Sequence, residues 1–301
     1  AKYRGKYKIG WDAIRQQRYE RLIESGLINE GWKLSARDTN VQNWEDVGDK
    51  DSRDLEMAVY AAMIDRMDQG IGRIMANVRQ LGIEDNTLVL FLSDNGSCAE
   101  DYNAFNTTAP DIPPGPMESY RTLGVSWANA SNTPFRKYKW WNHEGGISTP
   151  LIAYWPGVIK DGGKIIHQVC HVMDIMATCV EITGTEYPDS CDNQSIIPLE
   201  GKSLMPIFQD KQRQGYEALY WQFGSSCAIR KGKWKLVCSH INPGTGIDYF
   251  NDRNDNLMRQ WELYDMQTDQ TETNNLTQKY PEIVKQMARA WFEWNNRIKI
   301  N

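Results

Sequence analysis

The pattern that most restricts the fold is a long amphipathic segment followed directly by a short apolar one. From Asp51, a residue type that often caps a helix, apolar side chains recur every three or four positions as far as Leu81. Gly82 follows and is typical of a helix end. The run TLVLFLS at residues 87–93 is rich in β-branched and aromatic residues, which predicts a fully buried strand. A helix that feeds such a strand is half of a βα unit, so the sequence predicts an α/β fold with helices over both faces of its sheet.

Segments on either side of this pattern have signals of their own. Residues 7–25 predict a polar helix, and the chain from there to about Asp49 predicts an irregular loop. LIAYWPG at residues 151–157 predicts a second buried strand. Residues 167–184 have a helical periodicity that Gly184 closes.

The character of the sequence changes beyond residue 212. LYWQF, CAIRKGKWKLVC and WELYDM are short strand-like runs separated by turns, and a helix is predicted from Pro281 to about Lys299. We therefore expect two domains. The larger α/β domain covers residues 1–212, and a smaller α+β subdomain covers residues 213–301.

The composition is that of an ordinary globular protein and narrows the classes of function. Hydrophobic residues make up 41% and charged residues 24% of the 301 positions. The formal net charge is −5 and no block of Lys or Arg stands out, so nucleic acid is not expected as a partner. No run approaches the ~18 apolar residues of a membrane helix. The six cysteines include no C-x-x-C pair, which disfavours a zinc ribbon and leaves disulfides and thiols equally open.

Two adjacent polar residues follow the first predicted strand. Asp94 and Asn95 offer a carboxylate and an amide oxygen, which are the kinds of ligand that Ca²⁺ and Mg²⁺ prefer. The alternative is a plain turn, because Asp-Asn-Gly is a common turn sequence in which Gly96 is free to adopt positive φ. By themselves these residues favour the turn, although loops at strand ends often bind ligands in open α/β sheets.

A second cluster of polar residues precedes the second predicted strand. Arg136, Lys137, Lys139, His143 and Glu144 lie just before a pair of glycines. Cations at this position suit an anionic group such as a sulfate ester, because a Lys ammonium both attracts the charge and donates toward the bridging oxygen. The alternative is that these are solvated charges of a surface loop.

Taken in order, these motifs resemble the arylsulfatase family of the alkaline-phosphatase-like superfamily. The resemblance is carried by the helix at 57–75, SDNG at 93–96, KWWNHEGG at 139–146 and TPLIAYWPG at 149–157. It continues through PLEGKSLMPIF, AIRKGKWKLV and WELYDMQTDQTETNNL, so it covers nearly the whole chain. The implied fold is the alkaline-phosphatase-like sheet covered by helices, incomplete at its N-terminal side.

The resemblance also implies roles for single residues. Asp94 and Asn95 match the pair that binds a divalent metal ion, Ca²⁺ or Mg²⁺. Lys139, five positions before Glu144, matches the catalytic lysine that contacts the substrate sulfate. His143 is implied to contribute to a substrate subsite, and Glu144 to be a structural hydrogen-bond partner of the glycine-rich turn.

The family's nucleophile has no counterpart in this sequence. It is a formylglycine made from Cys or Ser within C/S-x-P-x-R, and no Cys or Ser here begins that pattern. The opening residues resemble the segment just after the family's last His motif, so formylglycine and any export signal are expected upstream. We therefore expect a periplasmic or secreted sulfuric ester hydrolase in full-length form. This chain would supply part of its metal and sulfate site, bind metal weakly or not at all, and be inactive alone.

The expected partners are a sulfated small molecule or sulfated glycan and the N-terminal part of the same protein. Two alternatives stay open. One is a phosphodiesterase or phosphonate hydrolase of the same superfamily, which would share the fold and a similar metal pair. The other is a non-catalytic scaffold module that kept the fold and lost the chemistry.

Overall fold

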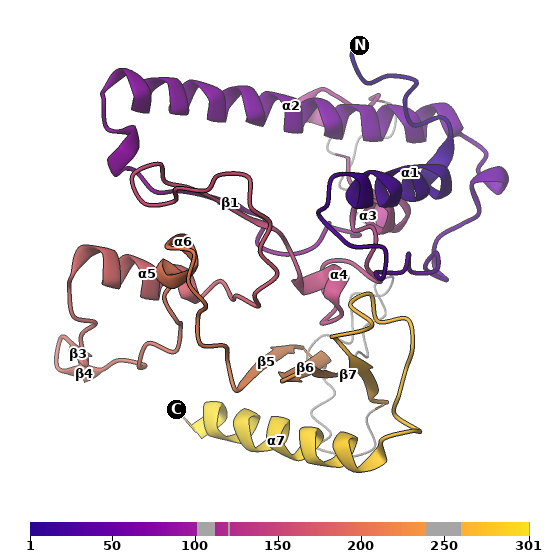
Figure 1. The fold of residues 1–301 in the computed structure, drawn as a ribbon. Coiled ribbons are helices and arrows are strands. Elements are labelled where there is room, and N and C mark those ends of the chain that lie inside the picture. Colours follow the sequence, from indigo (N-terminus) through magenta and orange to yellow (C-terminus); the bar gives the residue numbers. More distant parts are fainter. Residues whose placement is uncertain (101–111, 120, 225, 239–259, 301) are drawn as a thin grey trace. The chain divides into compact units, whose positions relative to one another are not determined.

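The structure is a computed structural model that describes residues 1–100, 112–119, 121–224, 226–238 and 260–300 (Figure 1). The chain divides into two compact units. Unit 1 comprises Ala1–Ile71, Asn95–Pro150 and Glu217–Asn301, and unit 2 comprises Gly72–Asp94 and Leu151–Tyr216. The segments of the expected C-terminal subdomain from Glu217 onward thus belong to unit 1, and the expected boundary after residue 212 stays a prediction. Within the described residues, no helix combines the length and the apolar character needed to cross a membrane.

The N-terminal part of unit 1 is built around three tryptophans. Helix α1 (Gly10–Glu24) confirms the predicted polar helix and contacts helix α3 (Gly124–Ser131). Trp11 of α1 packs edge-on against Trp44 and Trp127, with ring centroids 4.8 and 5.5 Å away. Trp44 begins the short 3-10 helix η1 (Trp44–Asp46), and η4 (Met117–Ser119) is a second such turn. Aromatic burial of this kind compensates for the few aliphatic residues in α1.

The long amphipathic helix is confirmed as α2 (Lys50–Gln80). Its predicted N-cap is wrong by two residues. The amide of Ser52 donates to Asp49 Oδ1 at 3.0 Å, so Asp49 caps the helix, whereas Asp51 forms a surface ion pair with Lys8. At the other end Gly82 adopts φ +67°, the left-handed conformation expected after a helix.

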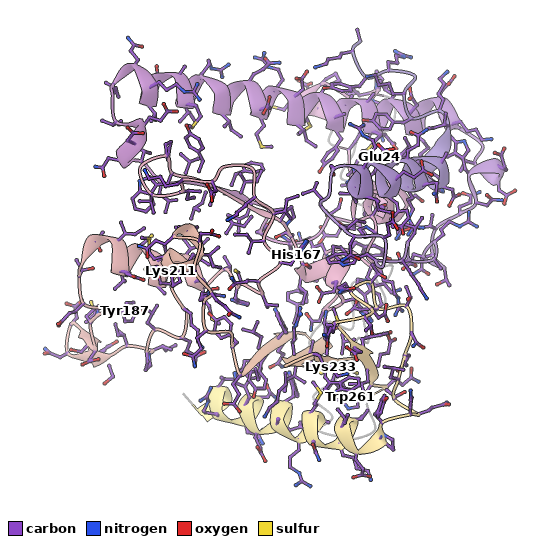
Figure 2. The ribbon with its side chains drawn as sticks, in the orientation of Figure 1. Glu24, His167, Tyr187, Lys211, Lys233 and Trp261 are labelled. Atoms are coloured by element: carbon purple, nitrogen blue, oxygen red, sulfur yellow. The ribbon has the colours of Figure 1, made fainter. Side chains whose placement is uncertain are left out.

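The C-terminal part of unit 1 is an antiparallel sheet covered by a helix. Strands β5 (Ala218–Phe223), β6 (Ser226–Lys231), β7 (Trp234–Cys238) and β8 (Glu262–Asp265) lie in that order, and the helix is α7 (Pro281–Ile300). The core between them contains the fully buried Trp291 of α7, which contacts Trp261 edge-on at 6.4 Å. Lys233 marks the turn between β6 and β7 (Figure 2). The strand character of these runs and the final helix were predicted correctly, but the run predicted as CAIRKGKWKLVC is two strands, β6 and β7, joined by a turn.

In unit 2, strands β1 (Val89–Leu92) and β2 (Leu151–Tyr154) pair antiparallel after the 3-10 turn η2 (Glu84–Asn86). One face of this pair packs on a core that includes Trp155 and helix α6 (Met205–Phe208). The other face is open, because Phe91 is 42% and Ile152 60% exposed. The prediction of a fully buried strand at residues 87–93 and of a second buried strand at 151–157 is therefore wrong about their burial. A continuous apolar run cannot show whether its second face is covered.

The remainder of unit 2 is organised by a buried carboxylate. Helix α5 (Asp174–Thr183) ends at Gly184 with φ +64°, as predicted, but it begins at Asp174 and not near residue 167. Asp174 is fully buried and accepts from the backbone amides of His171 and Lys202 and from Arg213 Nη1 at 2.8 Å. Strands β3 (Ser190–Cys191) and β4 (Gln194–Ser195) form a small hairpin. In the described part of the chain, Cys98, Cys170, Cys179 and Cys191 take part in no disulfide.

Candidate functional site

The Asp94-Asn95-Gly96 motif forms a bend just beyond β1. Asp94 is exposed and Asn95 half-buried, and the division between the two units falls between them. Gly96 does not have positive φ, so the turn interpretation does not explain this glycine. Instead its amide donates to Gly146 O at 3.0 Å, and a Cβ at Gly96 would lie 1.8 Å from Gly145 O. The glycine is needed for a close approach of two backbones.

That approach brings Lys139 beside the residues that follow Asn95. The Lys139 amide donates to Ser97 O at 3.1 Å. Asn132 reinforces the contact, because its side chain accepts from the Ser97 amide at 2.9 Å and donates to Lys137 O at 3.1 Å. Two motifs more than 40 positions apart in the sequence therefore meet in unit 1.

The cations of this loop differ in their surroundings. Lys137 Nζ lies 2.8 Å from Asp38, and Arg136 Nη1 lies 3.1 Å from Glu262. Lys139 is the most exposed of the three, with 39% of its side chain accessible, and its Nζ is 3.9 Å from Glu100. It also lies 5.8 Å from the centroid of the Trp140 ring, but no ion pair shorter than 3.9 Å is described for it, so it is the best able of the three to bind an added anion.

The glycine-rich turn after this loop is the short helix α4 (Glu144–Ile147), which is fixed by ionic contacts with the C-terminal segment. Glu144 Oε1 lies 2.6 Å from the ammonium of Lys235 on β7, and the Glu144 amide donates to Glu272 Oε2 at 2.8 Å. Lys235 also pairs with Glu272 Oε1 at 2.8 Å and is fully buried. Glu144 is thus a structural partner of this turn.

The charges of this cluster stabilise one another. Burial alone would lower the pKa of Lys235, but the two carboxylates outweigh it and raise the pKa above its usual value. Burial alone would raise the pKa of Glu144, but Lys235 and Arg230 lower it. The cluster therefore pairs one buried ammonium group with two carboxylates inside unit 1.

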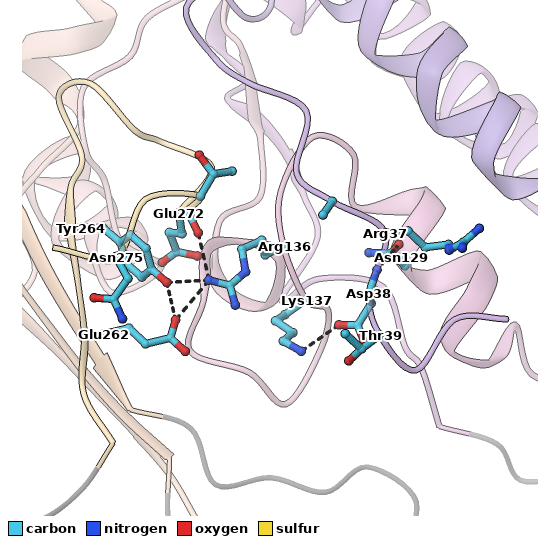
Figure 3. A pocket seen from close by; sticks show the side chains of 12 residues that line it. Arg37, Asp38, Thr39, Asn129, Arg136, Lys137, Glu262, Tyr264, Glu272 and Asn275 are labelled. Atoms are coloured by element: carbon cyan, nitrogen blue, oxygen red, sulfur yellow. Dashed lines mark hydrogen bonds and ion pairs between the residues drawn. The ribbon is translucent and has the colours of Figure 1, made fainter. Parts of the chain in front are cut away.

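A second network joins the loop to β8, as Figure 3 shows. Arg136 Nη1 contacts Glu262, the Tyr264 hydroxyl at 2.5 Å and the carbonyl of Glu272 at 2.9 Å. His143 Nε2 lies 3.0 Å from Glu262, which also accepts from the Tyr264 hydroxyl. Burial would raise the pKa of Glu262, but His143, Tyr264 and Arg136 lower it to about 2.

His143, predicted to contribute to a substrate subsite, is 2% exposed. A substrate contact would have to use its buried Nδ1, which has no hydrogen-bond partner among the described residues. The substrate role of His143 stays a prediction, as do the roles of Lys139, Asp94 and Asn95.

The sequence interpretation missed Lys235, Glu262 and Glu272 as partners of the loop. Lys235 had a local signal, because it is a charged residue inside the otherwise apolar strand Trp234–Cys238. The two glutamates had none, since their partners lie more than 100 positions away.

The donor chemistry of Asp94 and Asn95 fits a hard divalent cation, but their number does not complete a site. Ca²⁺ takes six to eight oxygen ligands, and these two residues offer two side-chain oxygen groups. Across the described ranges, no group of three or more His, Cys, Asp or Glu side chains converges as a metal site.

The arrangement is that of a mixed α/β protein, and two family models show which family it belongs to. The sulfatase model matches residues 11–185, and the model of the C-terminal part of N-sulphoglucosamine sulphohydrolase matches residues 136–296. The chain belongs to the sulfatase family.

Relatives with curated names agree with this assignment. An uncharacterized sulfatase of Schizosaccharomyces pombe is 29% identical over 96% of this chain and 53% of its own length. An arylsulfatase of Klebsiella aerogenes is 31% identical over 70% of this chain and 48% of its own. The chain thus spans about half the length of these relatives.

Solved structures show the fold. Ps i-CgsB in complex with k-i-k-neocarrahexaose has a TM-score of 0.55 at 20% identity, covering 94% of this chain and 54% of that one. A protein of glycosaminoglycan metabolism in Bacteroides thetaiotaomicron has a TM-score of 0.51 at 24% identity, over 78% of this chain and 43% of that one. The predicted fold class is confirmed.

Proposed function

We propose that the whole protein hydrolyses a sulfate ester, and that this chain contributes Lys139, Asp94 and Asn95 to the site. The observation that carries the proposal is the contact between the Lys139 segment and the residues after Asn95, fixed by the Lys139 amide and Ser97 O. Both segments lie within the residues that match the sulfatase model. The relatives' names support the reaction class.

Each residue has a role that follows from its chemistry. The Lys139 ammonium belongs to the most exposed of the three cations described for its loop, and it would hold the sulfate and donate toward the bridging oxygen as that bond breaks. Asp94 and Asn95 would supply oxygens to Ca²⁺ or Mg²⁺. When bound, such an ion neutralises charge that develops on the sulfate oxygens.

The nucleophile in this proposal is a formylglycine from a C/S-x-P-x-R segment of the whole protein. These 301 residues contain no such segment, so the chain alone is expected to be inactive. The substrate class is a sulfated glycan or a sulfated small molecule. Support for a glycan comes from N-acetylgalactosamine-6-sulfatase of mouse, which is 28% identical over 58% of this chain and 28% of its own length.

The open face of β1 and β2 is the proposed contact for the N-terminal part of the protein. Phe91, Ile152 and Tyr154 are exposed there, and contiguous apolar surface in a folded protein commonly marks an interaction site. The proposal keeps the expected periplasmic or secreted location, which fractionation of cells that make the full-length protein would test.

The test is turnover by the full-length protein on matched aryl sulfate, aryl phosphate and phosphonate esters. We expect preference for the sulfate, and a fall in kcat/KM of about 10²–10³-fold in Lys139→Ala, as for loss of one donor to a developing oxyanion. Lys211→Ala, which removes an exposed lysine of unit 2, should leave kcat/KM unchanged. Preference for the phosphate or phosphonate ester would show that the protein is a phosphodiesterase or phosphonate hydrolase and not a sulfatase. No turnover of any of the three esters would favour a scaffold module. Normal turnover by Lys139→Ala would remove the proposed role of Lys139.

A further inference from the structure

The residue after Lys139 has a backbone conformation that is unusual for its type. Trp140 has φ +84°, and Lys137, two positions before Lys139, has φ +65°. Residues with a Cβ rarely adopt this left-handed region, and for a bulky side chain it costs free energy that surrounding contacts must offset. Conformations of this kind are concentrated at functional sites. The contacts of Trp140 therefore indicate what its conformation achieves.

Two contacts hold the Trp140 side chain. Its ring packs edge-on against Phe223 of β5, with the ring centroids 4.7 Å apart. Its indole N–H donates to Glu100 Oε1 at 2.5 Å, and a hydrogen bond to an ionised acceptor is stronger than one between neutral groups. The Glu100 side chain is only 16% exposed, so the bond is partly shielded from water. Trp140 thus fixes a carboxylate as well as its own ring.

The oxygen that Trp140 holds is also the one nearest to the Lys139 ammonium. Glu100 Oε1 lies 3.9 Å from Lys139 Nζ, which is beyond hydrogen-bond distance. The other oxygen, Oε2, accepts from the Cys98 thiol at 3.4 Å. Burial raises the pKa of this thiol, which keeps it protonated and able to donate. Both oxygens of Glu100 therefore accept from groups other than Lys139.

The separation of 3.9 Å matters for what Lys139 can bind. Lys137 shows the alternative, because its ammonium lies 2.8 Å from Asp38 and is committed to that carboxylate. At such a distance Glu100 would take one N–H of Lys139 and compete with any other anion. At 3.9 Å it still attracts the ammonium but leaves the N–H donors to other acceptors. The Trp140 ring, 5.8 Å from Nζ, adds a weak cation–π attraction.

We propose that Trp140 is a positioning residue for Lys139. Its indole N–H holds the Glu100 carboxylate back from a direct ion pair with the ammonium, and so keeps the ammonium available to an anion. The inference rests on the proposed function, because the anion that Lys139 serves there is the sulfate of the ester. Trp140 itself is assigned no contact with the substrate.

The first experiment measures how fast Lys139 of the full-length protein reacts with trinitrobenzenesulfonate, an anionic amine reagent, with the labelled peptide quantified by mass spectrometry. Trp140→Phe keeps an aromatic ring and removes the N–H, so Glu100 is released to pair with the ammonium. Labelling of Lys139 should slow at least roughly threefold, the effect of one partly exposed ion pair. Adding Glu100→Gln to Trp140→Phe should restore the rate, because a neutral amide forms no ion pair.

The matched control is Trp294→Phe. Trp294 is also half-buried and its ring also packs on β5, against Tyr220 at 5.0 Å. This variant should label Lys139 at the unmodified rate. Circular dichroism checks that each variant folds, and Trp140→Leu, which also lacks the N–H, replaces Trp140→Phe if that variant does not fold.

The second experiment measures turnover of an aryl sulfate by the same variants. Trp140→Phe should raise KM by more than it lowers kcat, and Glu100→Gln should reverse the rise. Unchanged labelling, or unchanged KM in a protein that hydrolyses sulfate esters, would overturn the proposal. A loss that Glu100→Gln does not reverse would overturn it as well, because Trp140 would then act only on the folding of the loop. If the unmodified protein hydrolyses no sulfate ester, the proposed function fails, and the labelling alone decides the role of Trp140.

Discussion

At the scale of single residues, the least expected group is the ammonium of Lys235. It is fully buried, and its two carboxylate partners, Glu144 and Glu272, are themselves nearly enclosed. Two charges taken out of water repay their desolvation only when the geometry is good and further hydrogen bonds are made. Here the backbone amide of Glu144 supplies one of those bonds to Glu272. The cluster therefore acts as a unit and tolerates poorly the loss of one member.

Lys235→Met keeps most of the side-chain volume and removes the charge. We expect it to lower the free energy of unfolding by about 3–5 kcal/mol, because two carboxylates remain buried without their cation. Urea denaturation followed by tryptophan fluorescence measures the change. The matched control is Lys231→Met in the neighbouring strand, whose surface pair with Glu217 is exposed and should contribute under about 1 kcal/mol. Equal effects of the two substitutions would contradict the buried-cluster interpretation.

At the scale of elements, one hydrogen bond shows which residue caps the N-terminus of helix α2. Asp49 and Asp51 are both acidic residues near its start, and either matches the composition of a cap. The structure selects Asp49 through its bond to the Ser52 amide. Asp51 lies inside the first turn, where its charge still favours the positive end of the helix dipole.

Asp49→Ala should therefore destabilise the protein by about 1 kcal/mol, the usual effect of losing an N-cap side chain. Asp51→Ala removes an exposed pair with Lys8 and should have less effect. Thermal denaturation of the two variants side by side provides the measurement. A larger loss for Asp51→Ala would restore the cap originally predicted from the sequence.

At the scale of the whole molecule, the ionic networks of unit 1 connect stability to pH. The pKa of Glu262 is about 2 in the folded chain, below the ~4.3 of an ordinary glutamate, so the folded state binds fewer protons than the unfolded state. Its contribution to stability is complete above roughly pH 5 and is lost as the pH falls toward 2. Glu144 of unit 1 and Asp174 of unit 2 also have lowered pKa values and act in the same direction.

Glu262→Gln should flatten the loss of stability between roughly pH 5 and 2, because this side chain no longer gains a proton on unfolding. Urea midpoints measured across that range for the unmodified protein and the variant test the expectation. Glu217→Gln, at a position with an 89% exposed side chain, is the control and should follow the unmodified curve. Parallel curves for Glu262→Gln and the unmodified protein would show that Glu262 does not cause the acid sensitivity.

Much of the fold could be read from local patterns. The periodicity of α2, the left-handed glycines at 82 and 184 and the short strands beyond residue 212 each depend on neighbours a few positions away. Burial of β1 and β2 was predicted wrongly, because the covering of a strand depends on distant parts of a protein. The start of α5 was missed for the same reason, since Asp174 is held by Lys202 and Arg213.

For the candidate site, the sequence by itself determined the residue types, their order and the family likeness that singled out Asp94, Asn95 and Lys139. Only the tertiary structure showed that the Lys139 segment contacts the residues after Asn95, through the Lys139 amide and Ser97 O. It showed that Gly96 serves a close backbone contact with Gly145, which no turn propensity encodes. It also showed close carboxylate partners for Arg136 and Lys137, whereas Lys139 is more accessible and lies 3.9 Å from its nearest described carboxylate. The physical reason is that propensity and capping act within a few residues, whereas charge pairing and backbone packing depend on segments that only the folded chain brings together.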